Sequence, residues 1–271
     1  MAKSLGSSPR PAHAITLAEM NRHFDACPRC LTARNPLQHV HGGGTTERPG
    51  YCFVLINPTH RNLSTSPLYE GLRFPFIGVR AFWRVLNRGG FFSDEVLQIV
   101  EMKPWTDRTT KAVLTELKLQ GIYLTNLVKC AQPNPEVPDR RTFFEDMPLF
   151  SREMLLVRPS RIVAFGQLTV SVLTGQSIRL NDYYRGIRKM GMSTEFYFRP
   201  NEGPSIPVLP NFFPTGRGSP KLAAEILRLI KRTTWPEQSE RPSPRRGCSE
   251  ARASFAQHPQ DVNNSSNLPL M

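Results

Sequence analysis

The stretch FVLINPTH, from Phe53 to His60, predicts a short buried strand that ends at an amide, Asn57, followed at once by proline. A short apolar run bounded by a turn signal is typical of a strand in the interior of a sheet. A turn explains the proline, but it does not explain the amide. A related arrangement recurs at VLPNFFPTGRG, residues 208–218. We expect the two stretches to border one site.

Short apolar strands and helical segments alternate along the chain. The predicted strands are residues 51–57, 121–126, 161–166 and 206–211, and the predicted helices are residues 80–90, 142–157, 167–175 and 219–232. A T-x-x-E capping box at Thr142 and Glu145 is expected to open the second helix, and Ser219-Pro220 the last. The alternation predicts an α/β fold. We expect a three-layer sandwich with a central, mainly parallel four-stranded sheet and helices on both faces.

Amides follow most of the predicted strands. The first strand ends in Asn57, the second in Asn126, the third in Gly166 and the fourth in Asn211. Asn is common at strand ends for turn chemistry alone, but three amides at four ends are more than turns require. Because ligands bind beyond the carboxyl ends of parallel strands, these side chains are candidates for a binding site.

The charge balance indicates a polyanionic partner. Lys and Arg outnumber Asp and Glu by 35 to 22, which gives a formal net charge of +13. Residues 235–271 hold four Arg and four acidic residues, so the excess lies in residues 1–234. A folded domain this basic most often binds nucleic acid. A basic protein without a nucleic-acid role is the alternative.

Composition also suggests how the chain is organised. Residues 1–15 and 235–271 are rich in Ser, Pro and polar residues and are expected to be disordered, which leaves one domain at residues 16–234. We see neither an apolar run of roughly 20 residues nor a secretory signal. The expectation is an intracellular, monomeric protein without a membrane segment, whose five Cys are free or metal-bound.

The motifs INPTH, FPFIG…FWRVL, GIYLTNLVKC, RIVAFG and VLPNFFPTGRG, in this order, resemble the uracil-DNA glycosylase superfamily. The resemblance extends from about Cys27 to Arg232. The Asn-Pro motif is similar to that of the mismatch-specific and single-strand-selective branches. The resemblance implies a monofunctional DNA glycosylase of the base-excision repair type. Such an enzyme flips a deaminated base, foremost uracil, out of single- or double-stranded DNA and hydrolyses its N-glycosidic bond.

The resemblance also implies roles for residues near the first motif. Asn57 would hold the water that attacks C1′, with Pro58 beside the base. An amide has no useful basicity, so the contribution of Asn57 would be positional. Phe76 would stack on the flipped base, although an ordinary core aromatic is the alternative. Asn126 would recognise the Watson–Crick edge of the base, because an amide offers both a donor and an acceptor.

The late motif departs from the family pattern. Family members carry His-Pro-Ser or Asn-Pro-Ser there, and the His or Asn donates a hydrogen bond to the base oxygen as charge develops. Here Phe213 precedes Pro214 and can donate nothing. Asn211, His60 or Arg217 would have to supply the donor. Otherwise the chain is a weak or inactive member that binds DNA or senses damage, and a glycosylase for another modified base is a further alternative.

The loop after the late motif matches the family's minor-groove wedge. Its residues Thr215, Gly216, Arg217 and Gly218 are therefore expected to contact DNA, and Arg217 would fill the vacated stack or bind phosphate. A solvated turn is the alternative for this loop.

The cysteines match the iron–sulfur branches of the family only in part. Cys27, Cys30 and Cys130 correspond to three of the four ligands of a [4Fe–4S] cluster, and Met147 stands about where the fourth Cys is expected. A thioether is a poor ligand for such a cluster. Three alternatives stay open: no metal, a cluster with an unusual or missing fourth ligand, and a zinc ion held by Cys27, Cys30 and a His, either His39 or His41.

Overall fold

The computed structural model describes residues 16–25, 39–58, 79–102, 104–130, 138–216 and 218–235. The chain divides into two compact units, Met1–Pro236 and Glu237–Met271, and all described residues belong to the first. Some residues that the sequence proposes for the site lie outside the described part: Cys27, Cys30, His60, Phe76 and Arg217. In that part, no helix has the combination of length and apolar character needed to cross a membrane.

The described strands form one mixed sheet in the order β1-β3-β2-β4-β6-β5. Their bounds are β1 Gly43–Gly44, β2 Tyr51–Leu55, β3 Ile122–Asn126, β4 Ile162–Phe165, β5 Phe196–Phe198 and β6 Ile206–Asn211. The four central strands run parallel, whereas β1 and β5 pair antiparallel at the edges. The mainly parallel centre is confirmed. The predicted size of four strands was wrong, because β1 consists of two glycines and β5, with the sequence FYF, has only three residues.

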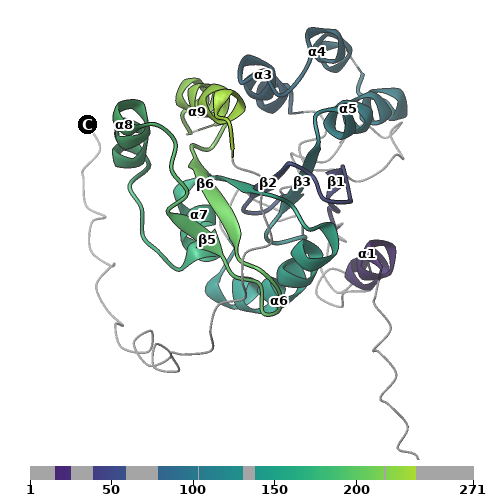
Figure 1. The fold of residues 1–271 in the computed structure, drawn as a ribbon. Helices are drawn as coiled ribbons and strands as arrows, with labels where there is room; N and C mark the ends of the chain where they lie inside the picture. Colours follow the sequence, from purple (N-terminus) through teal and green to yellow (C-terminus); the bar gives the residue numbers. More distant parts are fainter. Residues whose placement is uncertain are drawn as a thin grey trace, which may run out of the picture. The chain divides into compact units, whose positions relative to one another are not determined.

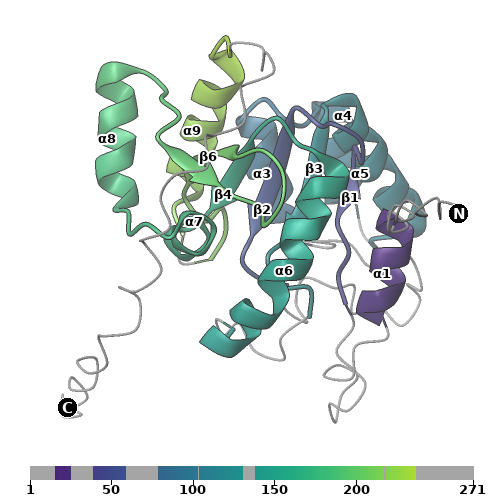
Figure 2. The ribbon, with the colours of Figure 1, turned by 60° about the horizontal axis from the view of Figure 1, so that its bottom comes forward.

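Helices cover both faces of the sheet, so the three-layer sandwich is confirmed (Figures 1 and 2). One face carries α3, α4, α5 and α9, and the other carries α1, α6 and α7. The helix α8 lies beside α9 at the β5–β6 end of the sheet. The helix bounds are α1 Leu17–Asp25, α3 Arg80–Arg88, α4 Asp94–Glu101, α5 Asp107–Leu119, α6 Arg140–Val157, α7 Gln167–Thr174, α8 Leu180–Met190 and α9 Pro220–Arg232.

The second predicted helix begins earlier than its capping box suggested. Its N-cap is Asp139, whose carboxylate accepts a hydrogen bond of 2.7 Å from the backbone N–H of Thr142. Glu145 instead accepts a hydrogen bond from Arg141. The box at Thr142 was therefore wrong, because an Asp three residues upstream satisfies the same backbone donor. The last helix does begin with Ser219 at the N-cap and Pro220 at N1, although the Ser219 side chain caps nothing.

Aromatic packing fixes the position of the central strands along their own axes relative to the helices. The Phe53 ring on β2 lies 5.5 Å from the Phe165 ring on β4 and 5.3 Å from the Phe91 ring, in both cases edge to face. Phe165 in turn contacts Phe82 of α3, at 6.2 Å between ring centroids. All four side chains are buried. Rings packed this tightly leave little freedom for the strands to slide, so the carboxyl ends of β2 and β4 have fixed positions.

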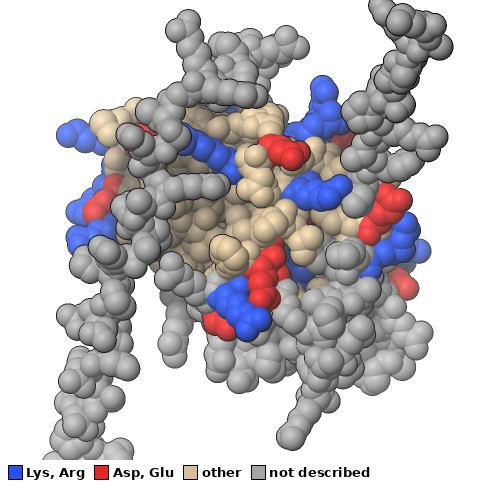
Figure 3. Space-filling view, turned by 90° about the horizontal axis from the view of Figure 1, so that it is seen from below, with Lys and Arg blue, Asp and Glu red and all other residues tan. Residues whose placement is uncertain are grey.

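The positive charge is not spread as one uniform layer. Figure 3 shows one face of the molecule, on which Lys and Arg side chains of the described residues lie next to Asp and Glu side chains around an uncharged centre. On this face, opposite charges are interspersed rather than sorted.

Candidate functional site

Strand register brings two of the amide-bearing ends side by side. Leu55 at the end of β2 aligns with Asn126 at the end of β3. The chain after β3 continues along β2, because Leu127 N–H donates to Leu55 C=O at 2.8 Å and Val128 N–H donates to Ile56 C=O at 3.0 Å. The segment that carries Asn57 is thereby held next to the segment that carries Asn126. Neighbouring strands are about 4.8 Å apart, a separation that one small ligand can bridge.

Asn126 is a buried amide whose side chain has no hydrogen-bond partner in the described part of the chain. The residue is 1% exposed. Neither its Nδ2 nor its Oδ1 has a hydrogen-bond partner among the described residues, and the only other such buried atom there is the hydroxyl oxygen of Tyr183. An unpaired buried amide costs stability, so its persistence calls for an explanation. An amide with a free donor and a free acceptor is suited to pair with the edge of a planar ligand such as a base.

Asn57 lies where the sequence places it, at the start of the turn after β2. Its side chain is half-buried, its Nδ2 donates to the carbonyl oxygen of Pro58 at 3.2 Å, and Pro58 itself is buried. This contact holds the amide close to the turn. The side chain is therefore positioned by the backbone and remains partly accessible, as an amide that binds a water would need to be.

Asn211 has both ends of its side-chain amide engaged inside the fold. It is fully buried, its Nδ2 donates to Ala223 C=O of α9 at 3.3 Å, and its Oδ1 accepts from Phe212 N–H at 2.8 Å. Three strand spacings, about 14 Å, separate β6 from β3 and hence Asn211 from Asn126. The predicted catalytic role of Asn211 stays untested, but its contacts favour a structural role that joins β6 to α9.

Phe213 borders the site from the opposite side. It is half-buried, and a Cβ added to Gly166, at the end of β4, would lie 3.7 Å from its ring. Gly166 has φ +95°, which L side chains rarely adopt. The positive φ of this glycine permits the sharp exit from β4, and the ring of Phe213 lies within van der Waals range of it. The position before Pro214 is thus filled by an aromatic ring that lies over β4.

The predicted wedge loop is a closed turn. Gly218 N–H donates to Thr215 C=O at 3.0 Å, and Ser219 N–H donates to Phe213 C=O at 3.1 Å. A Cβ on Gly218 would lie 2.0 Å from the carbonyl oxygen of Phe213, so only glycine fits there. Gly216, at φ +59°, is exposed at the tip. The turn ties the loop to Phe213, and its tip faces solvent.

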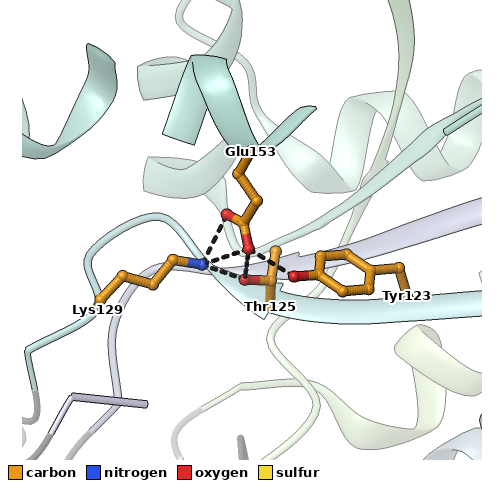
Figure 4. Close-up of polar contacts among 4 residues, drawn as sticks. All are labelled: Tyr123, Thr125, Lys129 and Glu153. Atoms are coloured by element: carbon orange, nitrogen blue, oxygen red, sulfur yellow. Dashed lines mark hydrogen bonds and ion pairs between the residues drawn. The ribbon is translucent and has the colours of Figure 1, made fainter. Parts of the chain in front are cut away.

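A buried polar network supports the end of β3, and the sequence interpretation missed it (Figure 4). Lys129 and Glu153 are 1% and 0% exposed, and Lys129 Nζ donates to the two carboxylate oxygens of Glu153 at 2.8 and 2.7 Å. Lys129 also donates to the Thr125 hydroxyl. Thr125 and Tyr123 donate to Glu153 at 3.0 and 2.7 Å. The network clamps β3 to α6 immediately beside Asn126.

The phenol of Tyr123 stays protonated in this network. Burial, reinforced by the Glu153 carboxylate, raises the pKa of Tyr123 well above its ordinary value. Tyr123 therefore stays protonated and keeps donating to Glu153. The sequence signal was present: Tyr123 and Thr125 alternate on a buried strand and so share a face, and a lone Lys129 stands among apolar neighbours.

The cysteine prediction is only partly covered by the described residues. Cys130 is buried, and its Sγ lies 3.3 Å from Nε2 of His39. Cys130 packs with Val128 and Phe143, whereas Met147 packs against the main core. Within the described part, no group of three or more His, Cys, Asp or Glu side chains could hold a metal ion. Of the predicted ligands, Cys130 and His39 thus lie in contact, whereas Cys27 and Cys30 fall outside the described residues.

The described part of the site combines Asn57, Pro58, Asn126, Gly166 and Phe213 at the carboxyl edge of a parallel sheet. No curated protein matches the chain significantly. The family model of the Uracil DNA glycosylase superfamily matches residues 47–231, which is more than half of the chain and includes every one of these residues. Members of that superfamily generally hydrolyse N-glycosidic bonds in DNA. This chain belongs to the uracil-DNA glycosylase superfamily.

Proposed function

We propose that the protein is a monofunctional DNA glycosylase that removes uracil or a related deaminated base. The observation that carries the proposal is the unpaired, buried amide of Asn126 beside the Asn-Pro turn of Asn57. Family membership supports DNA as the partner. The excess of 35 Lys and Arg over 22 Asp and Glu agrees with a polyanionic substrate.

Each of these two amides has a distinct task in the proposed reaction. Asn126 recognises the Watson–Crick edge of the flipped base through its donor and its acceptor. Asn57 holds the water that attacks C1′ as the sugar gains oxocarbenium character. The base leaves with the electron pair of the N-glycosidic bond. Phe76, His60 and Arg217, which lie outside the described residues, keep their predicted roles as stacking platform, candidate donor and wedge.

A non-catalytic DNA-binding or damage-sensing protein is the second candidate, and the position of Phe213 favours it. A side chain without a donor lies where the family places a hydrogen-bond donor to the departing base. Loss of such a donor slows related reactions by about 10²–10³-fold. Asn211 does not compensate readily, because both ends of its amide are engaged in the core.

Base release from defined oligonucleotides tests the proposed function. Purified protein is incubated with single- and double-stranded DNA that contains uracil, hypoxanthine, xanthine or a normal base at one position. Alkali then cleaves the abasic sites. The proposal predicts strand breaks at uracil or at another deaminated base. Binding without breaks at any of these bases supports the second candidate.

The variant Phe213→His tests whether the natural site lacks a hydrogen-bond donor to the departing base. If the natural site lacks its donor, this substitution restores a hydrogen bond and the single-turnover rate rises by about tenfold or more. An unchanged rate means that another residue already supplies the donor. Phe213→Leu is the matched control, because it opens the same space without adding a donor.

An absorption spectrum tests the cofactor prediction. If the protein carries an iron–sulfur cluster, the anaerobically purified full chain absorbs near 400 nm. Cys130→Ser then removes that absorption. Iron, sulfide and zinc analysis of the same sample distinguishes among the three alternatives stated from the sequence.

A further inference from the structure

A basic groove runs between α8 and α9, apart from the residues assigned to the base pocket. It consists of two adjoining hollows of about 650 and 300 Å³, which share Arg188 and Glu225. Half-buried Leu222 and Leu229 contribute apolar surface to the lining. The cations of the groove are Arg185, Arg188 and Lys189 from α8 and Lys221, Arg228 and Arg232 from α9.

The groove concentrates positive charge. Its lining holds six cationic side chains and one carboxylate, Glu225. That carboxylate accepts a hydrogen bond from the Tyr184 hydroxyl, so it links α8 to α9. Six cations against one carboxylate give the groove a positive potential, which attracts a polyanion.

Helical periodicity places the cations of α9 on one side. Lys221, Arg228 and Arg232 follow one another at spacings of seven and four residues, which are positions on one helix face. Within the groove, Arg185 pairs with Asp182 on its own helix, as Arg84 pairs with Glu101 and Arg141 with Glu145 elsewhere on the described surface. In the described part, by contrast, Lys189, Lys221 and Arg232 have exposed side chains without an ion pair or a hydrogen bond.

The groove begins next to the loop that the sequence assigns to DNA contact. Lys221 stands three residues after Gly218, the last residue of that loop. From Lys221 to Arg232 the helix rises about 16 Å at 1.5 Å per residue. One strand of a DNA duplex advances about 3.4 Å per nucleotide, so the groove matches about five nucleotides.

We propose that the groove between α8 and α9 binds the phosphodiester backbone of DNA that flanks the excised base. This inference rests on the proposed function, since it takes DNA as the substrate. The phosphates lie along the cationic rim, and the apolar floor faces the sugars. These contacts are independent of base identity, so the groove contributes affinity and orientation but not base selectivity.

Removing three of the unpaired cations tests the proposal. The variant Lys189→Gln/Lys221→Gln/Arg232→Gln is compared with wild type in binding to a 30-base-pair duplex that carries a stable abasic-site analogue. The dissociation constant is measured between about 50 and 300 mM KCl. The proposal predicts at least tenfold weaker binding near 150 mM. The slope of log K against log[salt] falls by about two to three, because each lost phosphate contact removes about 0.9 of slope.

A charge-matched variant is the control. Arg48→Gln/Lys118→Gln/Arg158→Gln removes three exposed cations that precede β2, β3 and β4 and so lie at the amino edge of the sheet, opposite the site. It loses the same net charge but is expected to bind DNA within about threefold of wild type. Equal weakening of the two variants, or an unchanged slope in the groove variant, overturns the proposal.

The base-release assay on the same samples keeps this inference separate from the proposed function. If wild type releases the base and the groove variant binds normally, the groove proposal fails and the function stands. If wild type binds DNA through the groove but releases no base, the groove proposal stands and catalysis fails.

Discussion

At the scale of single residues, two buried amides at strand ends differ in what their polar atoms contact. Asn126 at the end of β3 has neither atom paired among the described residues. Asn211 at the end of β6 bonds to Ala223 C=O and to Phe212 N–H. Sequence alone treats the two as equivalent. These contacts agree with the proposed ligand-binding role of Asn126 and favour a structural role for Asn211.

The two amides therefore predict opposite changes in stability. Asn126→Leu replaces an unpaired polar group by an apolar one of similar size, so the free energy of unfolding stays equal or rises by up to about 2 kcal/mol. Asn211→Leu removes the acceptor of the Phe212 backbone N–H and the hydrogen bond that joins β6 to Ala223 of α9, so the free energy of unfolding falls by about 1–3 kcal/mol. Urea denaturation followed by circular dichroism measures both.

The rate of base release tests the role of the Asn126 amide separately from its effect on stability. We expect Asn126→Leu to slow single-turnover release of uracil by about 100-fold or more while it leaves the protein at least as stable as wild type. If Asn126→Leu destabilises the protein as strongly as Asn211→Leu, then the amide of Asn126 has structural partners and its assigned role is wrong.

At the scale of secondary-structure elements, the ion pair Lys129–Glu153 holds the end of β3 against α6. Lys129→Met leaves the Glu153 carboxylate buried without its cation, so we expect the free energy of unfolding to fall by about 3–5 kcal/mol. The matched control is Arg84→Met, which breaks a pair of 2.6 Å whose Arg84 side chain is 50% exposed. The control is expected to cost less than about 1 kcal/mol.

A double substitution distinguishes an uncompensated charge from lost packing. Lys129→Met/Glu153→Gln removes both charges and keeps the approximate volumes. If the stray charge causes the loss, the double variant recovers most of the stability that Lys129→Met loses. Equal stability of the single and double variants, measured by urea denaturation, would mean that the packing of the Lys129 stem matters more than its charge.

At the scale of the whole molecule, the central sheet was predictable because its strands are short apolar runs. The runs at 51–57, 121–126, 161–166 and 206–211 contain β2, β3, β4 and β6. The edge strand β1 was missed because its two glycines become a strand only by pairing with β3, and β5 was missed because its aromatic run is only three residues long. The capping box failed for a similar reason, since Asp139 competes for the same backbone donor.

The candidate site was predictable only in part, because the sequence does not show which groups a side chain contacts. Strand ends indicated that Asn57 and Asn126 would be neighbours, because parallel strands expose their carboxyl ends at one edge. Sequence could not tell that Asn211 turns toward α9 or that Phe213 packs over Gly166. It could not tell that α8 and α9 form one basic groove, because their cations are more than thirty residues apart in the chain.

The most direct test of the central claim is base release by wild type and by Asn57→Ala on the same uracil-containing DNA. Single-turnover rates are measured at saturating protein, and DNA affinity is measured in parallel. The account predicts alkali-labile breaks with wild type. It also predicts a rate at least about 100-fold lower for Asn57→Ala, with DNA affinity within about threefold. Breaks at the same rate with Asn57→Ala, or no breaks at any deaminated base with wild type, would contradict it.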